Sequence, residues 1–389
     1  MIVKHRRRLL ARSLALFAAL GGPWSLPRAA LARQRHAPAR TGPGRYGSRV
    51  DVRHFIDELV AADGFSRAKL VRSFREARFR PTIIEAMDRP LVAPPKWYEY
   101  APRFLNAGRI GVGVEFWRAN EATLARAEDE FGVPAEIVVA ILGIETYWGR
   151  NTGGYRVLDA LSTLGFDYPR RASYFRGQLR EFLLFAREQE LPAPAPMGSY
   201  AGAMGLPQFM PGNVRRYALD YDGDGKIDLW QSAADSIGSV ANYLARHDWL
   251  RGQPVWSRAI VAESARGAIM ARLDGGISER RPLEAWNADG VGADRMPVPM
   301  TPQPVGVLML EEDPVSAATA VTDAGGAAAA ALRAADAAIP ATEPASLWIV
   351  FPNFYAITRY NRSRLYAAAV TRLAEELRAA QEALPRRGS

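Results

Sequence analysis

One apolar stretch constrains the fold of this chain more than any other feature. Residues 137–144 read IVVAILGI, and Pro134 before them suits the first turn of a helix, where no backbone N–H is needed. A helix that is apolar on every side must be buried on every side. The sequence therefore predicts a helix at the centre of a large core, with the rest of the chain packed around it.

A single acidic residue, Glu145, follows this stretch and precedes Thr146, Tyr147 and Trp148. Desolvation can move the pKa of a carboxyl by about 3–5 units, whereas a helix C-terminus disfavours a negative charge by only about 0.3–1 kcal/mol. Both effects favour the protonated form of Glu145, which suits a general acid. The alternative is a structural glutamate that forms an ion pair with Arg150.

Composition excludes several kinds of chemistry. The 389 residues include no cysteine, which excludes disulfides and thiolate sites, and only four histidines, which argues against a histidine-rich metal site. The formal net charge is +9, but residues 1–32 hold six basic and no acidic residues. The remaining 44 basic and 41 acidic residues give a balance of +3. This mild surplus suits an anionic polymer and does not argue for nucleic acid.

The first 32 residues have the features of a signal peptide. A basic segment precedes the apolar residues 14–20, and the sequence ALA at 30–32 fits a small-x-small cleavage site. The run RRRLL at 6–10 is typical either of a twin-arginine signal or of an ordinary basic segment. Because the chain has no cysteine, a lipoprotein anchor is excluded, and no later stretch has the length and apolar character of a transmembrane segment. We expect a periplasmic protein that begins near Arg33, with a disordered leader over residues 33–50.

The spacing of apolar residues divides the mature chain into a helical majority and a smaller part with strands. Helical spacing begins at residue 51, with a stop at Gly64 and a helix cap at Ser66. Short apolar runs between glycines and prolines replace it after residue 255. The expected parts are a helical α subdomain (residues 51–131) and a core (132–255). A small β-containing subdomain follows (256–346), with an alanine-rich low-complexity segment inside it (317–341). The chain then returns to the core and ends in a closing helix (347–389).

Residues 220–228, DYDGDGKID, match the start of an EF-hand loop. Acidic side chains fall at positions 1, 3, 5 and 9, and a glycine at position 6 allows the turn. Position 12 is Gln231 instead of Glu, so a longer loop over 220–235 would supply the late carboxylate. The sequence predicts a structural calcium site, with an empty acidic turn as the alternative. The predicted ligands are Asp220, Asp222, Asp224, the carbonyl of Lys226, and Asp235.

A set of motifs in fixed order resembles the B-type lytic murein transglycosylases. The motifs are GIETYWG, RRASYF, GSYAGAMGLPQFMPG, DYDGDGKIDLW, SVANYL with HDW, and NFYAITRYNRS, and the resemblance covers residues 52–377. It implies a mainly α (α+β) fold with a lysozyme-like helical core, an α subdomain, a small β-containing subdomain and a calcium loop. It also implies cleavage of the β-1,4 bond between N-acetylmuramic acid and N-acetylglucosamine without water, which leaves a 1,6-anhydromuramyl end.

The resemblance assigns roles to individual residues. Glu145 corresponds to the single catalytic acid and base of the family. Ser199 and Gln208 correspond to polar residues that line the cleft, although the segment alone also fits a glycine-rich packing loop. The positions that resemble sugar contacts are Tyr100, Tyr174, Tyr243, Tyr360 and Asn361. Each of these tyrosines, taken alone, is equally compatible with packing in the core.

The expected partners are peptidoglycan glycan strands, with cell-wall synthases or divisome proteins as further candidates. No cofactor is expected for catalysis. Two alternatives remain at this stage: a hydrolytic muramidase that uses the same acid, and a non-catalytic peptidoglycan-binding scaffold.

Overall fold

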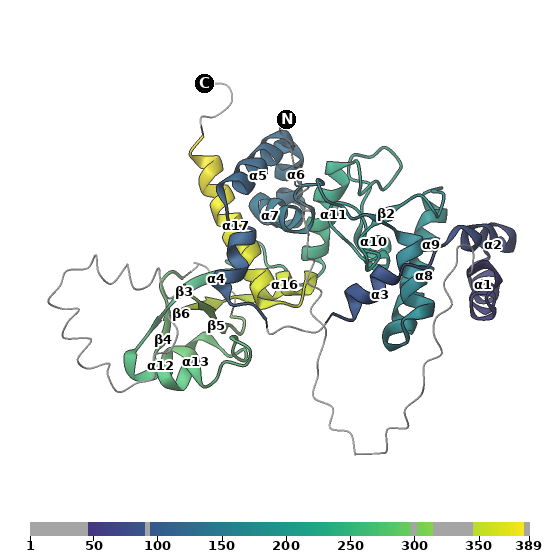
Figure 1. The fold of residues 1–389 in the computed structure, drawn as a ribbon. Coiled ribbons are helices and arrows are strands. Elements are labelled where there is room, and N and C mark those ends of the chain that lie inside the picture. Colours follow the sequence, from purple (N-terminus) through teal and green to yellow (C-terminus); the bar gives the residue numbers. More distant parts are fainter. Residues whose placement is uncertain (1–45, 90–93, 297–301, 314–344, 385–389) are drawn as a thin grey trace, which may run out of the picture.

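The computed structural model describes residues 46–89, 94–296, 302–313 and 345–384. Helices form most of the molecule, and a small sheet lies at one side of them (Figure 1). The helices are α1 (Val50–Asp63), α2 (Arg67–Glu76), α3 (Pro81–Met87), α4 (Trp97–Tyr100), α5 (Ala107–Ala119), α6 (Glu121–Phe131), α7 (Ala135–Thr146), α8 (Val157–Asp167), α9 (Ala172–Glu188), α10 (Pro211–Tyr217), α11 (Ala233–Ala245), α12 (Glu263–Met270), α13 (Leu283–Ala288), α16 (Pro352–Tyr360) and α17 (Arg364–Glu382). The strands are β1 (Tyr155–Arg156), β2 (Met197–Gly198), β3 (Trp256–Val261), β4 (Val291–Ala293), β5 (Gly306–Glu311) and β6 (Ala345–Val350).

Helix α7 is the central helix that the apolar stretch predicts. Every residue from Ala135 to Gly143 is buried, and Pro134 occupies the N-cap position immediately before the first turn. Helices α5, α6, α11 and α17 pack around it. Burial on all sides explains why the sequence of α7 has no polar face.

The N-terminal helices dock on α8 through a buried carboxylate. Asp159, which is fully buried, accepts hydrogen bonds from the Arg80 guanidinium at 3.0 and 2.9 Å and from the Arg78 backbone N–H at 2.9 Å. Arg156 pairs with the same carboxylate at 2.7 Å. These bonds join the chain before α3 to the core.

The leader predicted over residues 33–50 ends earlier than the sequence indicates. Tyr46 is buried, and its hydroxyl donates to Asp167 at 2.6 Å, while Arg49 forms an ion pair with the same carboxylate at 2.6 Å. Residues 46–50 are therefore ordered. The partner lies in α8, far along the chain, so local composition gives no sign of this contact.

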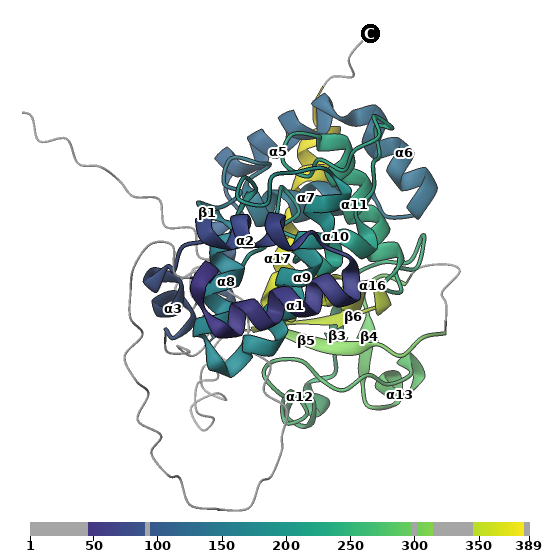
Figure 2. The same cartoon turned by 90° about the vertical axis from the view of Figure 1, so that its right-hand side faces the viewer.

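The main sheet is antiparallel, with the strand order β4-β3-β6-β5. Helices α12 and α13 cover one face of the sheet and the helical body covers the other (Figure 2). Side chains of β5 alternate accordingly: Val307 joins the cluster under α12 and α13, whereas Leu308 and Leu310 join the main core. The β-containing subdomain thus has a core of its own.

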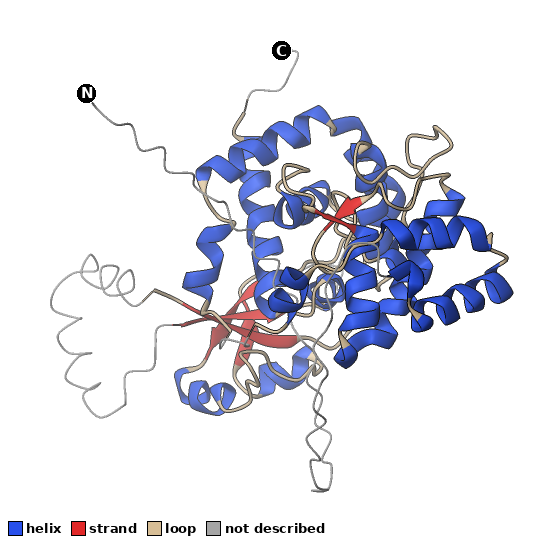
Figure 3. Cartoon of the chain, turned by 45° about the vertical axis from the view of Figure 1, so that its right-hand side comes forward, coloured by secondary structure: helices blue, strands red, loops and turns tan. Residues whose placement is uncertain are grey.

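One expected boundary is moved by strand pairing. The sequence assigns residues 347–389 to a return to the core, but β6 pairs with both β3 and β5 and so lies inside the sheet. A short apolar run predicts a strand without saying which sheet it joins. Elsewhere in the described residues, strands form only the two-residue ladder of β1 with β2 (Figure 3). The alanine-rich segment 317–341 lies outside the described residues.

Candidate active site

Glu145 lies in the last turn of α7, where its Oε1 accepts a hydrogen bond from the Tyr366 hydroxyl at 2.7 Å. Burial raises the pKa of Glu145 to about 7, although the bond from Tyr366 acts in the opposite direction. No other carboxylate and no arginine among the described residues contributes to this shift. A carboxyl with such a pKa exchanges its proton near neutral pH, which suits both a general acid and a general base.

The structure does not support the alternative of an ion pair between Glu145 and Arg150. The Arg150 guanidinium lies over the ring of Tyr147, 5.0 Å from its centre. Arg109 lies over the same ring at 4.7 Å and donates to the Gly143 carbonyl at 2.5 Å. The guanidinium groups of Arg150 and Arg109 therefore contact the Tyr147 ring and the backbone instead of the Glu145 carboxylate.

An abrupt stop of α7 holds Glu145 in position. Tyr147 and Trp148 both adopt the left-handed conformation, with φ of 55° and 52°, and such strain is often found at functional sites. The Trp148 indole donates to the Val139 carbonyl at 2.9 Å and lies against Gly143, where a Cβ would come within 2.4 Å of it. Thr146 donates to the Leu206 carbonyl at 3.0 Å, which ties the helix end to the glycine-rich loop.

The glycine-rich loop brings Ser199 and Gln208 to this region. Ser199 is buried, and its hydroxyl oxygen accepts a hydrogen bond from the Ala203 N–H at 3.0 Å. Gln208 has a positive φ of 49°, and its Nε2 donates to the carbonyls of Thr152 at 3.1 Å and Gly205 at 2.9 Å. These bonds fix the amide beside the segment that follows Glu145. The carbonyl oxygen of Gln208 makes no hydrogen bond within the described residues and is free to accept one from a ligand.

The charge of Glu145 affects the pKa values of three tyrosines. Burial, and then this charge, raises the pKa of Tyr100 to about 12 and raises the pKa values of Tyr360 and Tyr366 well above their usual range. The rings of Tyr360 and Tyr366 are stacked, with centroids 6.4 Å apart. Tyr360 also donates to the Pro207 carbonyl at 2.5 Å. Tyr366 therefore contacts the carboxyl and Tyr360 lies against Tyr366, while the pKa of Tyr100 responds to the same charge.

The other positions predicted to contact sugars form no hydrogen bond with Glu145 within the described residues. Tyr243 is buried behind Tyr360, with ring centroids 5.0 Å apart, and its hydroxyl donates to the Arg359 carbonyl at 2.7 Å. Tyr174 is 42% exposed at the start of α9 and contacts Arg171 and Phe175. Asn361 is the C-cap residue of α16, directly after Tyr360.

Sequence reasoning missed Tyr366, which among the described residues is the one that donates to the Glu145 side chain. It lies in the first turn of α17, just beyond the NFYAITRYNRS motif. A tyrosine close to the N-terminus of a helix otherwise rich in alanine is a weak signal. Its partner is 221 positions away in the chain, so only the tertiary fold reveals the contact.

The acidic loop gathers three carboxylates. Oxygen atoms of Asp220, Asp222 and Asp235 all lie within 4.8 Å of one another. Asp235 accepts hydrogen bonds from the backbone N–H groups of Tyr221 and Asp228, each at 2.7 Å. Asp224 lies outside this group and accepts from the Lys226 N–H at 2.8 Å. Such a cluster of hard oxygen donors fits a calcium ion.

The family follows from comparison with known proteins. The family described as "Transglycosylase SLT domain" matches residues 48–321 and 310–375 of the chain. The chain belongs to this family. A relative of this transglycosylase is the membrane-bound lytic murein transglycosylase B of Escherichia coli K12, which is 36% identical over 342 residues, covering 85% of the chain and 84% of the relative.

Solved structures agree with the assignment. The soluble lytic transglycosylase SltB1 from Pseudomonas aeruginosa is 42% identical, with a TM-score of 0.72, and the match covers 85% of this transglycosylase and 99% of SltB1. The lytic transglycosylase SLT35 of Escherichia coli, solved in complex with calcium, is 34% identical with a TM-score of 0.72, covering 88% and 97% of the two chains.

These similarities confirm the predicted family, the lysozyme-like fold class and the enzyme class. The family cleaves the glycan strands of peptidoglycan without hydrolysis, so this transglycosylase is a peptidoglycan lyase. Within the described residues, no helix combines the length and the apolar character that crossing a bilayer requires.

Proposed function

We propose that Glu145 alone carries the chemistry of this lytic transglycosylase, first as acid and then as base. Protonated Glu145 gives its proton to the oxygen of the β-1,4 bond between N-acetylmuramic acid and N-acetylglucosamine, and the bond to the anomeric carbon breaks. The N-acetyl oxygen of the substrate stabilises the oxocarbenium-like carbon. Ionised Glu145 then takes the proton of the C6 hydroxyl as that oxygen bonds to the anomeric carbon, which closes the 1,6-anhydro ring.

The isolated carboxyl with its raised pKa is the observation that carries this proposal. Most glycosidases pair two carboxylates, and substrate-assisted enzymes are the exception. At Glu145, burial dominates the shift and no second carboxylate of the described residues contributes. An internal nucleophile removes the need for one and gains from proximity. The hydrogen bond from Tyr366 stabilises the ionised state in which Glu145 acts as base.

Muropeptide analysis after digestion of purified sacculi tests the proposed reaction. We expect released disaccharide peptides that are one water lighter than hydrolytic products and end in 1,6-anhydromuramic acid. Mass spectrometry separates the three functions considered above. Products that retain the water would identify a hydrolytic muramidase, and the absence of soluble products would identify a non-catalytic binding protein.

The pKa of Glu145 predicts how activity depends on pH. Because the first step needs the protonated acid, kcat/KM should be level below pH 7 and fall about tenfold per pH unit above it. The free energy of unfolding should also fall as pH rises. A raised carboxyl pKa means that the folded state holds a proton which the unfolded state loses above pH 4.5, so stability falls as pH rises from 4.5 through about 7. A rate that increases through pH 7 would contradict the acid role.

We also propose that calcium occupies the acidic loop and acts on stability alone. The ligands would be the side chains of Asp220, Asp222, Asp224 and Asp235, together with the carbonyl of Lys226. Three gathered carboxylates support this proposal, as does the calcium complex of SLT35. Bound calcium would neutralise the mutual repulsion of these carboxylates, and no step of the reaction involves it.

Finally, we infer that residues 1–32 direct export to the periplasm, where glycan strands, synthases and divisome proteins are accessible partners. Residues 1–45 lie outside the described residues, so the support is the order of basic, apolar and small residues. The intact mass of the exported protein should correspond to a chain that begins near Arg33. A mature protein that still contains residues 1–32 would contradict this prediction.

A further inference from the structure

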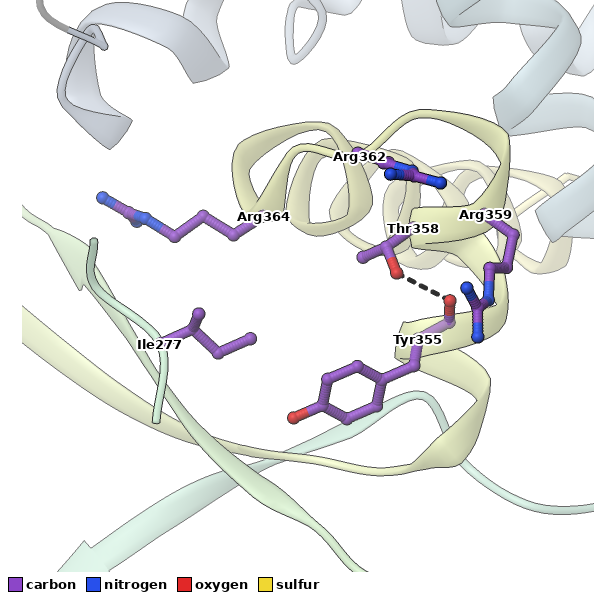
Figure 4. A pocket seen from close by; sticks show the side chains of 6 residues that line it. All are labelled: Ile277, Tyr355, Thr358, Arg359, Arg362 and Arg364. Carbon is purple, nitrogen blue, oxygen red and sulfur yellow. Dashed lines mark hydrogen bonds between the residues drawn. The ribbon is translucent and has the colours of Figure 1, made fainter. Parts of the chain in front are cut away.

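A basic pocket lies where the β-containing subdomain meets α16 and the start of α17 (Figure 4). Its volume is about 430 Å³, which is within the usual range for sites that bind small ligands. The lining residues are Ile277, Tyr355, Thr358, Arg359, Arg362 and Arg364. Half of them are arginines, and none is acidic.

The three arginines have different partners. Arg364 donates to the Glu311 carboxylate at 2.7 Å and to the Met309 carbonyl at 2.8 Å, which attaches α17 to β5. Arg359 and Arg362 are exposed, and the described residues form no ion pair with either side chain. In Figure 4 these two side chains lie on one side of Thr358, while Arg364 extends to the other. The pocket therefore has two positive charges without an acidic partner.

A further cation increases the positive potential of the pocket. The Arg280 guanidinium lies 4.5 Å from the centre of the Tyr355 ring, which forms part of the wall. Its Nε donates to the Pro304 carbonyl at 3.3 Å, so its charge is not neutralised by that bond. Like charges gathered without a counterion repel one another and favour an anionic ligand.

One short segment of the chain contributes residues to both the pocket and the Glu145 site. The turn that carries Arg362 lies between Tyr360 and Tyr366, both of which feel the charge of Glu145. The two tyrosines face the helical core, where their hydroxyls donate to Pro207 and Glu145. The arginines between them face the β-containing subdomain. Residues 359–366 thus contribute side chains both to the pocket and to the Glu145 site.

From this arrangement we infer that the pocket binds the carboxylates of a murein stem peptide and sets the preference for peptide-bearing strands. In intact murein the lactyl carboxyl of each muramic acid is held in an amide bond to the peptide, so the sugars present hydroxyl and N-acetyl groups, whereas the peptide carries free carboxylates. Guanidinium groups match carboxylates in geometry and can bind them with two parallel hydrogen bonds. Arg359 and Arg362 would bind the peptide while the Glu145 site binds the glycan. The inference rests on the proposed cleavage reaction and adds a determinant of specificity to it.

The test compares two substrates: glycan strands from sacculi with their stem peptides, and the same strands after an amidase has removed the peptides, which leaves only the lactyl carboxylate beside each muramic acid ring. For wild-type protein we expect a lower KM for the peptide-bearing strands. The double variant Arg359→Ala/Arg362→Ala should raise that KM about tenfold. Each exposed ion pair contributes little by itself, so the variant removes both together. The variant should have the wild-type kcat on both substrates. It should also have the wild-type KM for peptide-free strands. The difference between the two wild-type substrates should also shrink at high salt.

A matched control separates the pocket from general attraction between a basic protein and an acidic polymer. Arg53 in α1 and Arg72 in α2 are exposed, and no hydrogen bond or ion pair of their side chains is formed within the described residues. Arg53→Ala/Arg72→Ala removes the same charge and should leave both KM values unchanged. The double variant Arg359→Lys/Arg362→Lys should retain part of the preference. An equal effect of the pocket variant on both substrates, or no effect on either, would overturn the inference. Failure of the wild type to cleave either substrate would instead contradict the proposed reaction.

Discussion

Glu145→Gln should reduce the release of 1,6-anhydro products by about 10⁴-fold or more. Glutamine keeps the shape of the side chain and can still accept the hydrogen bond from Tyr366, but it can neither donate nor take up the catalytic proton. Proton transfer by a positioned side chain typically contributes about 10²–10⁴-fold. One group serves both half-reactions here, so the loss should reach the upper end of this range. Muropeptide release by the purified variant is the measurement.

The same substitution should leave the melting temperature unchanged or raise it. Above pH 7 the wild type must either hold an ionised carboxyl in a desolvated site or bind a proton from solution, and glutamine avoids both costs. Glu58→Gln, at an exposed position of α1, is a matched control and should alter neither activity nor stability. A Glu145 variant that melts earlier but still releases anhydro products at nearly the wild-type rate would contradict the mechanism.

Tyr366 offers an independent check on the role of Glu145. The hydroxyl lowers the pKa of Glu145, so Tyr366→Phe should move the alkaline limb of the pH profile to higher pH. A purely structural tyrosine would change stability without moving this limb. The direction of the shift therefore distinguishes a residue that positions and tunes the carboxyl from one that only fills the core.

Local patterns predicted the parts of this molecule that are encoded locally. Four features depend only on residues within a few positions of one another: the apolar run of α7, the helix end at Gly64, the helix cap at Ser66 and the turns of the acidic loop. Contacts between distant segments were not predictable in this way. Tyr366 reaches Glu145 only because α17 packs along α7, and β6 pairs with β3 and β5, which lie far from it in the chain.

The predicted site residues show the same division. The family resemblance assigned Tyr100 and Tyr360 as sugar contacts; in the structure Tyr360 stacks on Tyr366, which donates to Glu145, and the pKa of Tyr100 responds to the charge of Glu145. It could not indicate that the Tyr243 hydroxyl is already committed to the Arg359 carbonyl, since that bond joins α11 to α16. It also gave no indication that Tyr46 and Arg49 belong to the folded body. The sequence pattern thus predicts which residues belong to the site better than what each one contacts.

Removal of calcium should lower the melting temperature by several degrees. A ligand that binds only the folded state at about 1,000 times its dissociation constant adds roughly 4 kcal/mol to stability. Without the ion, the carboxylates of Asp220, Asp222 and Asp235 repel one another within 4.8 Å. Their loop is also attached to the core: the Tyr221 hydroxyl donates to Glu130 at 3.0 Å, and the Leu229 carbonyl accepts from the Leu206 N–H at 2.8 Å. Loss of order in the loop would therefore weaken helix packing and the glycine-rich loop together.

Melting curves of the same preparation with calcium and with a chelator measure this effect, and Asp222→Asn provides the matched variant. The Asp222 carboxylate accepts from the Asp224 N–H at 3.3 Å and from the Ser232 hydroxyl at 2.7 Å. Asparagine can accept the first bond through its carbonyl oxygen and replace the second by donating to the hydroxyl oxygen, so it removes charge with little change in local bonding. In chelator the variant should melt at or above the wild-type temperature, because repulsion is reduced, whereas calcium should stabilise it much less. Identical melting of the wild type in calcium and in chelator, with metal content verified in each, would show that the carboxylates form an acidic turn and not a calcium site.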